Sequence, residues 1–421
     1  MKTNVIRILV GCVLSLSLSV GLLAEEHPKI ILVHYMPWYD SKPISGNWGW
    51  HWTMDRFAPE KIKKNGQREV ASHYYPLIGP YDSNDPDALE YHVLLMKLSG
   101  IDGVIVDWYG IKDFHDYGSI HRNTQHLVKF VKKAGLKFAV CYEDRTIIPM
   151  VNTKNLKATE DVLHAAEVMK WLDKNWFSDD AYVRIKSRPI LSVFGPMYFK
   201  TVEQWKQIFA EITTQPVFYA LPHLAKSTGS DGAFGWPPVH GGKEITPATW
   251  KTYLSDLYAR KHAEDSVIAV VFPKFHDIYE KSYGYIDDRD GKTFEETLEL
   301  SMKSEAALVQ IATWNDYGEG TIIEPTVEFG YRYLESLQKH KARKSGKTFQ
   351  HTADDLRLPL MLYTLRKQTG SDRKVLANLD AISDLLFASK CNEAKALIAK
   401  YQSRIGEPSP AGNVLTAAPE E

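Results

Sequence analysis

Short runs of apolar residues recur along the chain, and stretches with helical spacing of polar and apolar positions separate them. Most of the runs are continuous, as expected for strands buried on both faces of a parallel sheet. The first helical stretch has clear end signals, since Asp85 can cap it, Pro86 fits its first turn and Gly100 can end it. The predicted strands cover residues 29–35, 102–108, 137–143, 188–194, 216–221, 232–236, 266–272 and 307–314.

Eight strands that alternate with helices over about 310 residues predict an α/β fold, a (β/α)8 TIM barrel. A doubly wound open sheet is the alternative, but no glycine-rich phosphate-binding loop follows the first strand. After residue 350 the pattern changes to amphipathic helices without strands. We therefore expect a barrel over residues 25–345, a C-terminal helical extension over 346–405 and a disordered tail over 406–421.

The first 24 residues have the pattern of a secretory signal peptide. Lys2 and Arg7 precede an apolar run of 16 residues, which is short for a membrane-spanning helix, and Ala24 follows it. The stretch LVGC at 9–12 looks like a lipoprotein box, but Cys12 precedes most of the apolar run, so lipid anchoring is the less favoured alternative. We expect export to the medium or the periplasm, with no integral membrane span.

Composition narrows the range of partners. Lys and Arg number 51 against 52 Asp and Glu, and this balance argues against a nucleic-acid partner. Aromatic residues are abundant, with 11 Trp, 22 Tyr and 16 Phe. Aromatic side chains at strand ends suit stacking on sugar rings and suit a large core almost equally well. A monomer is expected.

Neither the cysteines nor the acidic stretches indicate a metal site. Cys141 and Cys391 are predicted to be buried free thiols and not a disulfide, and no CxxC or HExxH pattern is present. Residues 287–296 look like a calcium loop, but Ile286 and Thr297 occupy its first and last ligand positions, so we predict a turn and a helix start. We expect no metal and no cofactor.

Polar and aromatic residues follow most of the predicted strands. In a barrel enzyme the working residues lie at the carboxyl ends of the strands, so these positions are the candidates for substrate contact. His34, His223 and His276 can each be either a buried core histidine or a ligand contact. The candidate substrate-binding residues at these ends are Tyr35, Trp38, Tyr39, Asp107, Trp108, Tyr109, Glu143, His223, Trp236, His276, Trp314 and Asn315.

Two carboxylates follow the last strand at a spacing that suits acid–base chemistry. Asp316 and Glu319 are three residues apart, so one helix-like turn would place their Cβ atoms roughly 5–6 Å apart on one face. Retaining glycosidases hold two carboxyl groups about 5–5.5 Å apart. Crowding two acids separates their pKa values, which leaves one protonated and one ionised. The alternative is a capped turn with two solvated acids.

Two segments carry a resemblance to a known family. TWNDYGEGTIIEPT (313–326) resembles the TWNEW-EGT-IEP segment of glycoside hydrolase family 99, the endo-α-mannosidases. HYYPLIGPYDSNDPDALEYHVLLMKLSGIDGVIVDWYG (73–110) resembles the same family's GxYDS-DP…AGIDGxxxxWYG segment. The WNDYGE core is also similar to family 71, the α-1,3-glucanases. The resemblance runs from about residue 29 to 340 and implies a secreted, metal-free barrel that cleaves internal α-mannosidic bonds with retention.

The resemblance also implies roles for single residues. Glu319 matches the general acid, and Asp316 falls where family 99 has a glutamate base that deprotonates the sugar's own 2-hydroxyl to give an anhydro-sugar. An aspartate there is a departure that matches the family 71 pattern instead. Glu143 corresponds to a substrate-binding carboxylate, and Glu324 to a substrate or supporting residue. Asp82 either shapes a turn before the first helix or touches sugar.

These observations together predict an exported, retaining glycoside hydrolase acting on α-mannan or a related α-glycan. Its partner is a polysaccharide or oligosaccharide, with tryptophans stacking on sugar rings and Asn315 and Glu143 bonding hydroxyls. Three alternatives stay open: an α-1,3-glucanase-like hydrolase, a non-catalytic glycan-binding barrel that has lost its base, and a structural surface protein. The predicted stacking residues are Trp38, Trp108, Trp236 and Trp314.

Overall fold

The computed structural model describes residues 29–260, 267–345, 348–369 and 373–405. The expected signal peptide and the expected C-terminal tail lie outside the described residues. The domain boundaries given above stay predictions.

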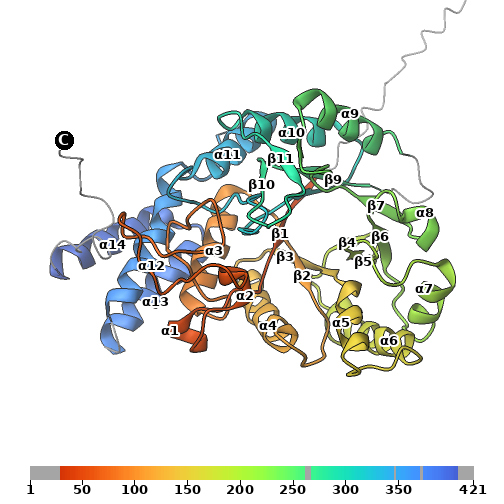
Figure 1. Ribbon diagram of the computed structural model, residues 1–421. Helices are drawn as coiled ribbons and strands as arrows, with labels where there is room; N and C mark the ends of the chain where they lie inside the picture. Colours follow the sequence, from red (N-terminus) through yellow and green to blue (C-terminus); the bar gives the residue numbers. More distant parts are fainter. Residues whose placement is uncertain (1–28, 261–266, 346–347, 370–372, 406–421) are drawn as a thin grey trace, which may run out of the picture.

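Eight parallel strands close into a barrel, so the prediction of a (β/α)8 fold is confirmed (Figure 1). β1 pairs with β12 on one side and with β2 on the other, and the pairing of β3 with β5 closes the ring. All eight predicted strands are present, most of them a residue or two shorter than expected. The barrel strands are β1 (Ile30–Tyr35), β2 (Gly103–Trp108), β3 (Lys137–Tyr142), β5 (Arg188–Val193), β6 (Val217–Ala220), β7 (Gly232–Phe234), β9 (Val267–Val271) and β12 (Leu308–Ile311).

Helices and short extra strands connect the barrel strands, and the main helices form the outer ring in Figure 1. The main helices are α3 (Pro86–Ser99), α4 (Tyr117–Lys133), α6 (Asp161–Leu172), α7 (Val202–Phe209), α9 (Pro247–Tyr258), α10 (Lys292–Lys303) and α11 (Arg332–Ser345). The short elements are α1 (Lys42–Ser45), α2 (Trp50–Thr53), η1 (Asp144–Thr146), α5 (Ile147–Asn152), η2 (Asp173–Phe177), β4 (Arg184–Ile185), α8 (Ala225–Thr228), β8 (Lys243–Glu244), β10 (Phe275–His276) and β11 (Gly284–Ile286).

The predicted end signals of α3 act as expected. The Asp85 side chain accepts a hydrogen bond from the backbone N–H of Asp87, and Pro86 occupies the first turn. Gly100 ends the helix with φ of 86°, a left-handed conformation that a residue without Cβ adopts at little cost. The stretch at 287–296 also behaves as predicted, because it forms a turn that leads into α10 at Lys292.

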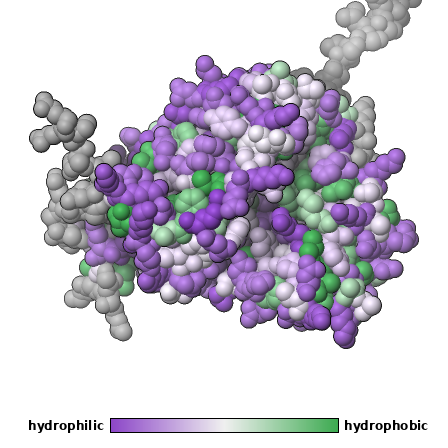
Figure 2. Space-filling model, in the orientation of Figure 1, coloured by the Kyte–Doolittle hydropathy of each residue, from purple (hydrophilic) through white to green (hydrophobic). Residues whose placement is uncertain are grey.

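The surface and the thiols are typical of a globular protein. The face in Figure 2 is mostly hydrophilic, with hydrophobic side chains in small separate spots. Among the described residues, no helix combines the length and the apolar character needed to cross a membrane. Cys141 and Cys391 are buried free thiols, as predicted.

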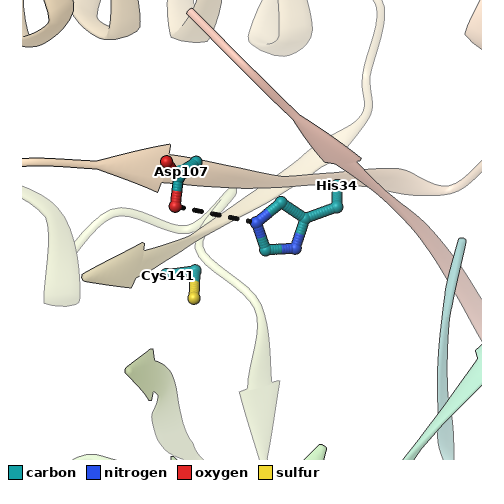
Figure 3. A group of neighbouring side chains, drawn as sticks. All are labelled: His34, Asp107 and Cys141. Atoms are coloured by element: carbon teal, nitrogen blue, oxygen red, sulfur yellow. Dashed lines mark ion pairs between the residues drawn. The ribbon is translucent and has the colours of Figure 1, made fainter. Parts of the chain in front are cut away.

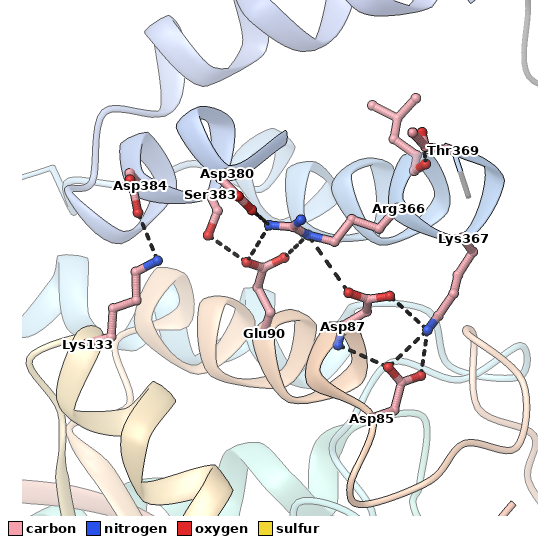
Figure 4. Close-up of polar contacts among 11 residues, drawn as sticks. Asp85, Asp87, Glu90, Lys133, Arg366, Lys367, Thr369, Asp380, Ser383 and Asp384 are labelled. Atoms are coloured by element: carbon pink, nitrogen blue, oxygen red, sulfur yellow. Dashed lines mark hydrogen bonds and ion pairs between the residues drawn. The ribbon is translucent and has the colours of Figure 1, made fainter. Parts of the chain in front are cut away.

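A helical extension packs against one side of the barrel. It comprises η3 (Asp354–Arg357), α12 (Leu358–Thr369), α13 (Arg373–Phe387) and α14 (Cys391–Ile405), and α12 packs on α3 (Figures 1 and 4). Arg366 of α12 donates two hydrogen bonds to the Glu90 carboxylate, at 2.7 and 3.0 Å. Ser383 of α13 donates a third, at 2.6 Å. Because Glu90 is buried, its charge depends on these partners from the extension.

Replacing Arg366 by Met is expected to destabilise the fold by about 3–5 kcal/mol, because it leaves the Glu90 charge buried without its cation. Chemical denaturation measures the loss. The matched control is Lys133→Met. Lys133 pairs with Asp384 at the surface, where the Lys133 side chain is 46% exposed and the Asp384 side chain is 67% exposed. That variant should lose about 1 kcal/mol or less. Equal losses for the two variants would contradict the importance of the Arg366–Glu90 pair.

Candidate active site

A cavity of about 1210 Å³ opens at the carboxyl ends of the barrel strands. Both predicted catalytic carboxylates lie on its wall, and they come from the turn after β12. Six of the predicted substrate-binding residues share that wall: Trp38, Tyr39, Asp107, Tyr109, Glu143 and Trp236.

The turn after β12 is held by hydrogen bonds from its own side chains. Asp316 accepts a 2.9 Å bond from the backbone N–H of Glu319 through Oδ1, and its own N–H donates to Thr313 Oγ1. The backbone N–H of Gly320 donates to the Asp316 carbonyl at 2.9 Å, which closes one helical turn. The alternative of a capped turn is thus right about the backbone. It is wrong about solvation, because Asp316 is only 4% exposed.

Gly320 allows this turn to sit close to its neighbour. Its φ is 66°, and a Cβ added there would lie 2.5 Å from the carbonyl oxygen of His276. Only glycine fits such an approach, which accounts for the glycine that directly follows Glu319 in the motif.

The pKa values of the two carboxyls of the turn are raised to different extents. Burial raises the pKa of Asp316 to about 6, although hydrogen bonds from the backbone of Glu319 and Gly318 and the field of His34 oppose the shift. Burial together with the charge of Asp316 raises the pKa of Glu319 well above its usual range. Asp316 therefore ionises first and Glu319 keeps its proton, which is the division of roles that acid–base cleavage needs.

Two further carboxyls face the same cavity. Burial raises the pKa of Asp107 and of Glu143 well above their usual range, and the charges of neighbouring carboxylates add to the effect. Arg145 opposes the shift, with its Nε 3.8 Å from Glu143 Oε2. Burial lowers the pKa of His34 to about 4, so its ring is uncharged at neutral pH. The wall thus offers both hydrogen-bond donors and acceptors to sugar hydroxyls.

A buried network fixes the turn against β1. The Asn315 side chain accepts from the backbone N–H of Met36 at 2.8 Å and donates to the Met36 carbonyl at 2.9 Å. The Tyr39 hydroxyl donates to the Asn315 carbonyl at 2.8 Å and accepts from the N–H of Tyr317. Asn315 is fully buried and off the cavity wall, so the predicted bond from Asn315 to a sugar hydroxyl is wrong. Its side chain joins the turn to the backbone of Met36 instead.

Glu324 extends the same network and also lies off the cavity wall. Its carboxylate accepts from the Tyr81 hydroxyl at 2.9 Å and lies 3.0 Å from His92 Nε2, while His92 Nδ1 bonds to the Tyr35 hydroxyl. Asn315 Nδ2 donates to Tyr81, which links this chain to the turn. Glu324 and Tyr35 therefore support the site from behind and do not line it.

The remaining candidates also lie away from the wall. Asp82 accepts from the backbone N–H of Ser41 and Asn84, so it shapes the turn before α3. Trp108 and Trp314 are fully buried in the core, and the Trp108 indole donates to His121 of α4. His276 stacks on His73 with ring centroids 3.7 Å apart, and His223 follows β6 outside the cavity. The prediction that Trp108 and Trp314 stack on sugar rings is wrong, because neither side chain exposes a ring face.

The cavity wall contains several residues that sequence reasoning missed. Arg145 lies two residues after Glu143, and its place just past a strand end was a usable signal. His51 comes from α2, and its ring stacks on Trp38 at 4.1 Å. Tyr279 and Tyr283 come from the long segment after β9. The sequence signal for these loop residues was only the high density of aromatic residues. It does not show which side chains face the cavity, because the shape of the loop decides that.

Trp236 contacts Glu319, the predicted acid, directly. Its indole Nε1 donates to Glu319 Oε2 at 3.3 Å, and this bond lowers the pKa of Glu319 relative to the carboxyl without it. Replacing Trp236 by Phe removes the donor, so the pKa of Glu319 should rise. Because the acid must be protonated to act, the alkaline limb of the kcat/KM–pH profile should move to higher pH.

The matched control for this shift is Trp38→Phe. Trp38 shares the cavity wall, and its indole N–H has no hydrogen-bond partner among the described residues. That variant should change KM and leave the alkaline limb in place. A limb that stays fixed in Trp236→Phe would contradict a tuning contact.

Two family models match consecutive parts of the chain. Residues 27–219 match "Glycosyl hydrolase family 99", and residues 242–337 match "Glycosyltransferase WbsX". The first match includes β1 to β5 and most of β6, and the second includes β12 with the turn that carries Asp316 and Glu319.

The chain is also similar to individual glycoside hydrolases. The glycoprotein endo-alpha-1,2-mannosidase of Mus musculus is 23% identical over 399 residues, covering 79% of each chain. A mutanase of Penicillium rubens is 28% identical over 164 residues, covering 36% of this chain and 35% of its own. The solved family 99 endo-alpha-mannosidase of Bacteroides thetaiotaomicron superimposes with a TM-score of 0.55 at 20% identity, covering 75% of this chain and 98% of that one.

Proposed function

We propose that this chain, a glycoside hydrolase of the family 99 type, cleaves α-mannosidic or related α-glycan linkages with retention of configuration. One observation carries the proposal. Two carboxyls, the buried Asp316 and the half-buried Glu319, lie on one cavity wall, and their environments raise the two pKa values by different amounts.

In the first step, Asp316 takes the proton of the sugar's 2-hydroxyl and the freed oxygen attacks C1. The glycosidic C1–O bond breaks, and Glu319 gives its proton to the leaving oxygen. In the second step, the Glu319 carboxylate takes a proton from water, whose oxygen attacks C1. The bond between C1 and O2 breaks, and Asp316 returns its proton to O2. Two displacements at C1 give net retention.

The wall around the two carboxyls suits a sugar. Asp107, Glu143 and Arg145 offer polar atoms to ring hydroxyls, while Trp38, Tyr109 and Trp236 present aromatic rings. Aromatic faces bind the apolar side of a sugar, and the fixed polar groups orient it.

A second substrate class is supported by Asp316 itself. An aspartate at this position follows the family 71 pattern and not that of family 99. An α-1,3-glucan is therefore the alternative substrate, and the anhydro-sugar steps above apply to α-mannosides, because the 2-hydroxyl of an α-glucoside lies on the same face of the ring as the leaving oxygen. Export of the chain, which rests on residues 1–24, and a monomeric state are part of the same proposal.

Digestion of a panel of α-mannans and α-1,3-glucan tests the proposal. New reducing ends from one of these classes are expected, and NMR during the first turnovers should show the product with the anomeric configuration of the substrate. An inverted product would contradict the mechanism. Binding to the glycans without any cleavage would favour the non-catalytic barrel.

A further inference from the structure

Three metal-ligating side chains meet at the base of the cavity, each from a different neighbouring strand. Asp107 of β2 and Cys141 of β3 are register partners, so their side chains lie side by side on one face of the sheet. His34 of β1 is paired with Ile105, two residues before Asp107, and so shares that face. Figure 3 shows the His34 ring with one nitrogen toward Asp107 and the Cys141 sulfur on the same side.

The polar atoms of this group have unmet hydrogen-bonding capacity. Both ring nitrogens of His34 and the Oδ2 atom of Asp107 are buried and have no hydrogen-bond partner among the described residues. His34 Nε2 and Asp107 Oδ1 are 3.9 Å apart, which is too far for a hydrogen bond. Buried polar atoms are nearly always paired, and a buried carboxylate needs a cation or a proton. A cation at this position would pair with the His34 nitrogen that faces Asp107 and with the Asp107 carboxylate at once, while the other ring nitrogen points away from it and interacts with the Gln310 side chain.

The donor set selects the class of cation. One imidazole nitrogen, one thiolate and one carboxylate oxygen suit thiophilic divalent ions such as Zn²⁺ or Co²⁺. The three ligand atoms lie within 4.8 Å of one another. Tetrahedral zinc with bonds of about 2.0–2.3 Å places its ligands roughly 3.3–3.8 Å apart, so the side chains need to close by about 1 Å.

The position of the group couples it to the catalytic turn. His34 and Asp107 lie on the cavity wall with Asp316, and the charge of Asp316 acts on both of them. Cys141 is buried and lies behind the wall. An ion held here would keep its fourth coordination position open toward the space that the substrate occupies, beside the Asp316 carboxylate.

We propose that His34, Asp107 and Cys141 bind one thiophilic divalent cation, with Zn²⁺ as the reference ion, and that its binding blocks glycan cleavage. The thiol loses its proton to solvent as the sulfur–metal bond forms. The bound ion withdraws Asp316 from base chemistry and occupies part of the sugar site. The inhibition rests on the proposed glycosidase function, whereas the binding does not.

A second group provides the matched control. His351, Asp355 and Cys391 also lie within 4.8 Å of one another, in the helical extension. There the Cys391 sulfur and His351 Nδ1 are already hydrogen-bonded at 3.6 Å, and Asp355 accepts from the Thr352 N–H and hydroxyl. Because its atoms have partners, this group has less to gain from an ion.

The binding test uses the EDTA-treated full chain. Calorimetry with Zn²⁺ and absorption spectroscopy with Co²⁺ should both give one site per chain, with a thiolate-to-cobalt band in the near ultraviolet. Cys141→Ala should weaken Zn²⁺ binding by at least about 10-fold and abolish the band, whereas Cys391→Ala should leave both unchanged. If Cys141→Ala fails to fold, Cys141→Ser takes its place. No binding by the wild type, or equal binding by Cys141→Ala, would overturn the proposal.

The activity test measures glycan cleavage with and without Zn²⁺. Cys141 lies off the cavity wall, so Cys141→Ala should keep the basal activity and lose most of the inhibition by Zn²⁺. Equal inhibition of the two proteins would overturn the link to this site. If the wild type cleaves no glycan, the proposed function fails, and the calorimetric and cobalt measurements still decide whether the site exists.

Discussion

Replacing Glu319 by Gln is expected to lower kcat on the preferred α-glycan by about 10²–10⁴-fold while KM changes little. Gln has nearly the shape of the protonated acid and can keep the contact with Trp236, but it cannot give a proton to the leaving oxygen. Glu319 is suited to this donation because burial and the charge of Asp316 raise its pKa well above the usual range. Steady-state kinetics on the natural glycan measures the loss.

The leaving group separates proton donation from other causes of lost activity. An aryl α-glycoside with an acidic phenol departs without protonation, so Glu319→Gln should lose much less activity on it than on the glycan. Glu143→Gln is the matched control, because Glu143 is a buried carboxyl of the same cavity. That variant should lose activity equally on both substrates. Equal losses for Glu319→Gln on the two substrates would show that Glu319 is not the acid.

The barrel was predictable because its strands are buried on both faces. Continuous apolar runs such as IILVHY have few other stable placements, and their alternation with capped helices leaves little choice of topology. The eighth strand was predicted four residues too long, three of them at its C-terminal end. The apolar character continues through Ala312 to Trp314, but there the chain leaves the sheet ladder and bonds to Thr321 and to the carbonyl of His34. Hydrophobicity marks burial and does not by itself mark a strand end.

The site was predictable to the level of strand ends and not to the level of side-chain direction. Successive side chains of a strand point to opposite faces, so one residue of each adjacent pair faces the barrel interior and the other faces the helices. His34 and Asp107 face the cavity, whereas Tyr35 bonds to His92 of α3 and Trp108 to His121 of α4. Strict use of this alternation would have removed Tyr35 and Trp108 from the candidates.

The loops could not be predicted in the same way. His51 and Tyr279 reach the wall from long segments after β1 and β9, where no periodicity fixes the direction of a side chain. Asn315 was misjudged for a different reason. A polar residue beside two predicted catalytic carboxylates suggested contact with substrate, but both ends of the Asn315 side-chain amide bond to the backbone of Met36.

The geometry of the turn explains why an aspartate occupies position 316. Its Oδ1 accepts the N–H of Glu319 three residues later, at 2.9 Å. Short side chains make such local bonds to the backbone, and an extra methylene carries the carboxylate past the N–H. Asp316 therefore holds Glu319 in place with one oxygen and leaves the other oxygen free for its proposed role as base. A glutamate would reach further into the cavity and would weaken the cap.

Replacing Asp316 by Asn is accordingly expected to preserve the turn and remove the base, lowering kcat by about 10²–10⁴-fold. The amide oxygen of Asn can still accept the Glu319 N–H, so the melting temperature should change little. In the wild type, burial raises the pKa of Asp316 to about 6, and the base must be ionised to act. Activity should therefore fall as pH drops below about 6, and the residual activity of Asp316→Asn should lack this acid limb.

The comparison variant is Asp316→Glu, which keeps a carboxylate and loses the short cap. If the cap matters, Asp316→Glu should melt at a lower temperature than Asp316→Asn and yet retain an acid limb, because a titrating base remains. Stability and ionisation then separate in the two variants. If the acid limb persists unchanged in Asp316→Asn, the ionisation that causes it belongs to another buried carboxyl. Asp107 and Glu143 are the candidates, because burial raises their pKa values as well. The base would then be reassigned to that residue, with Asp316 left as the cap that positions Glu319.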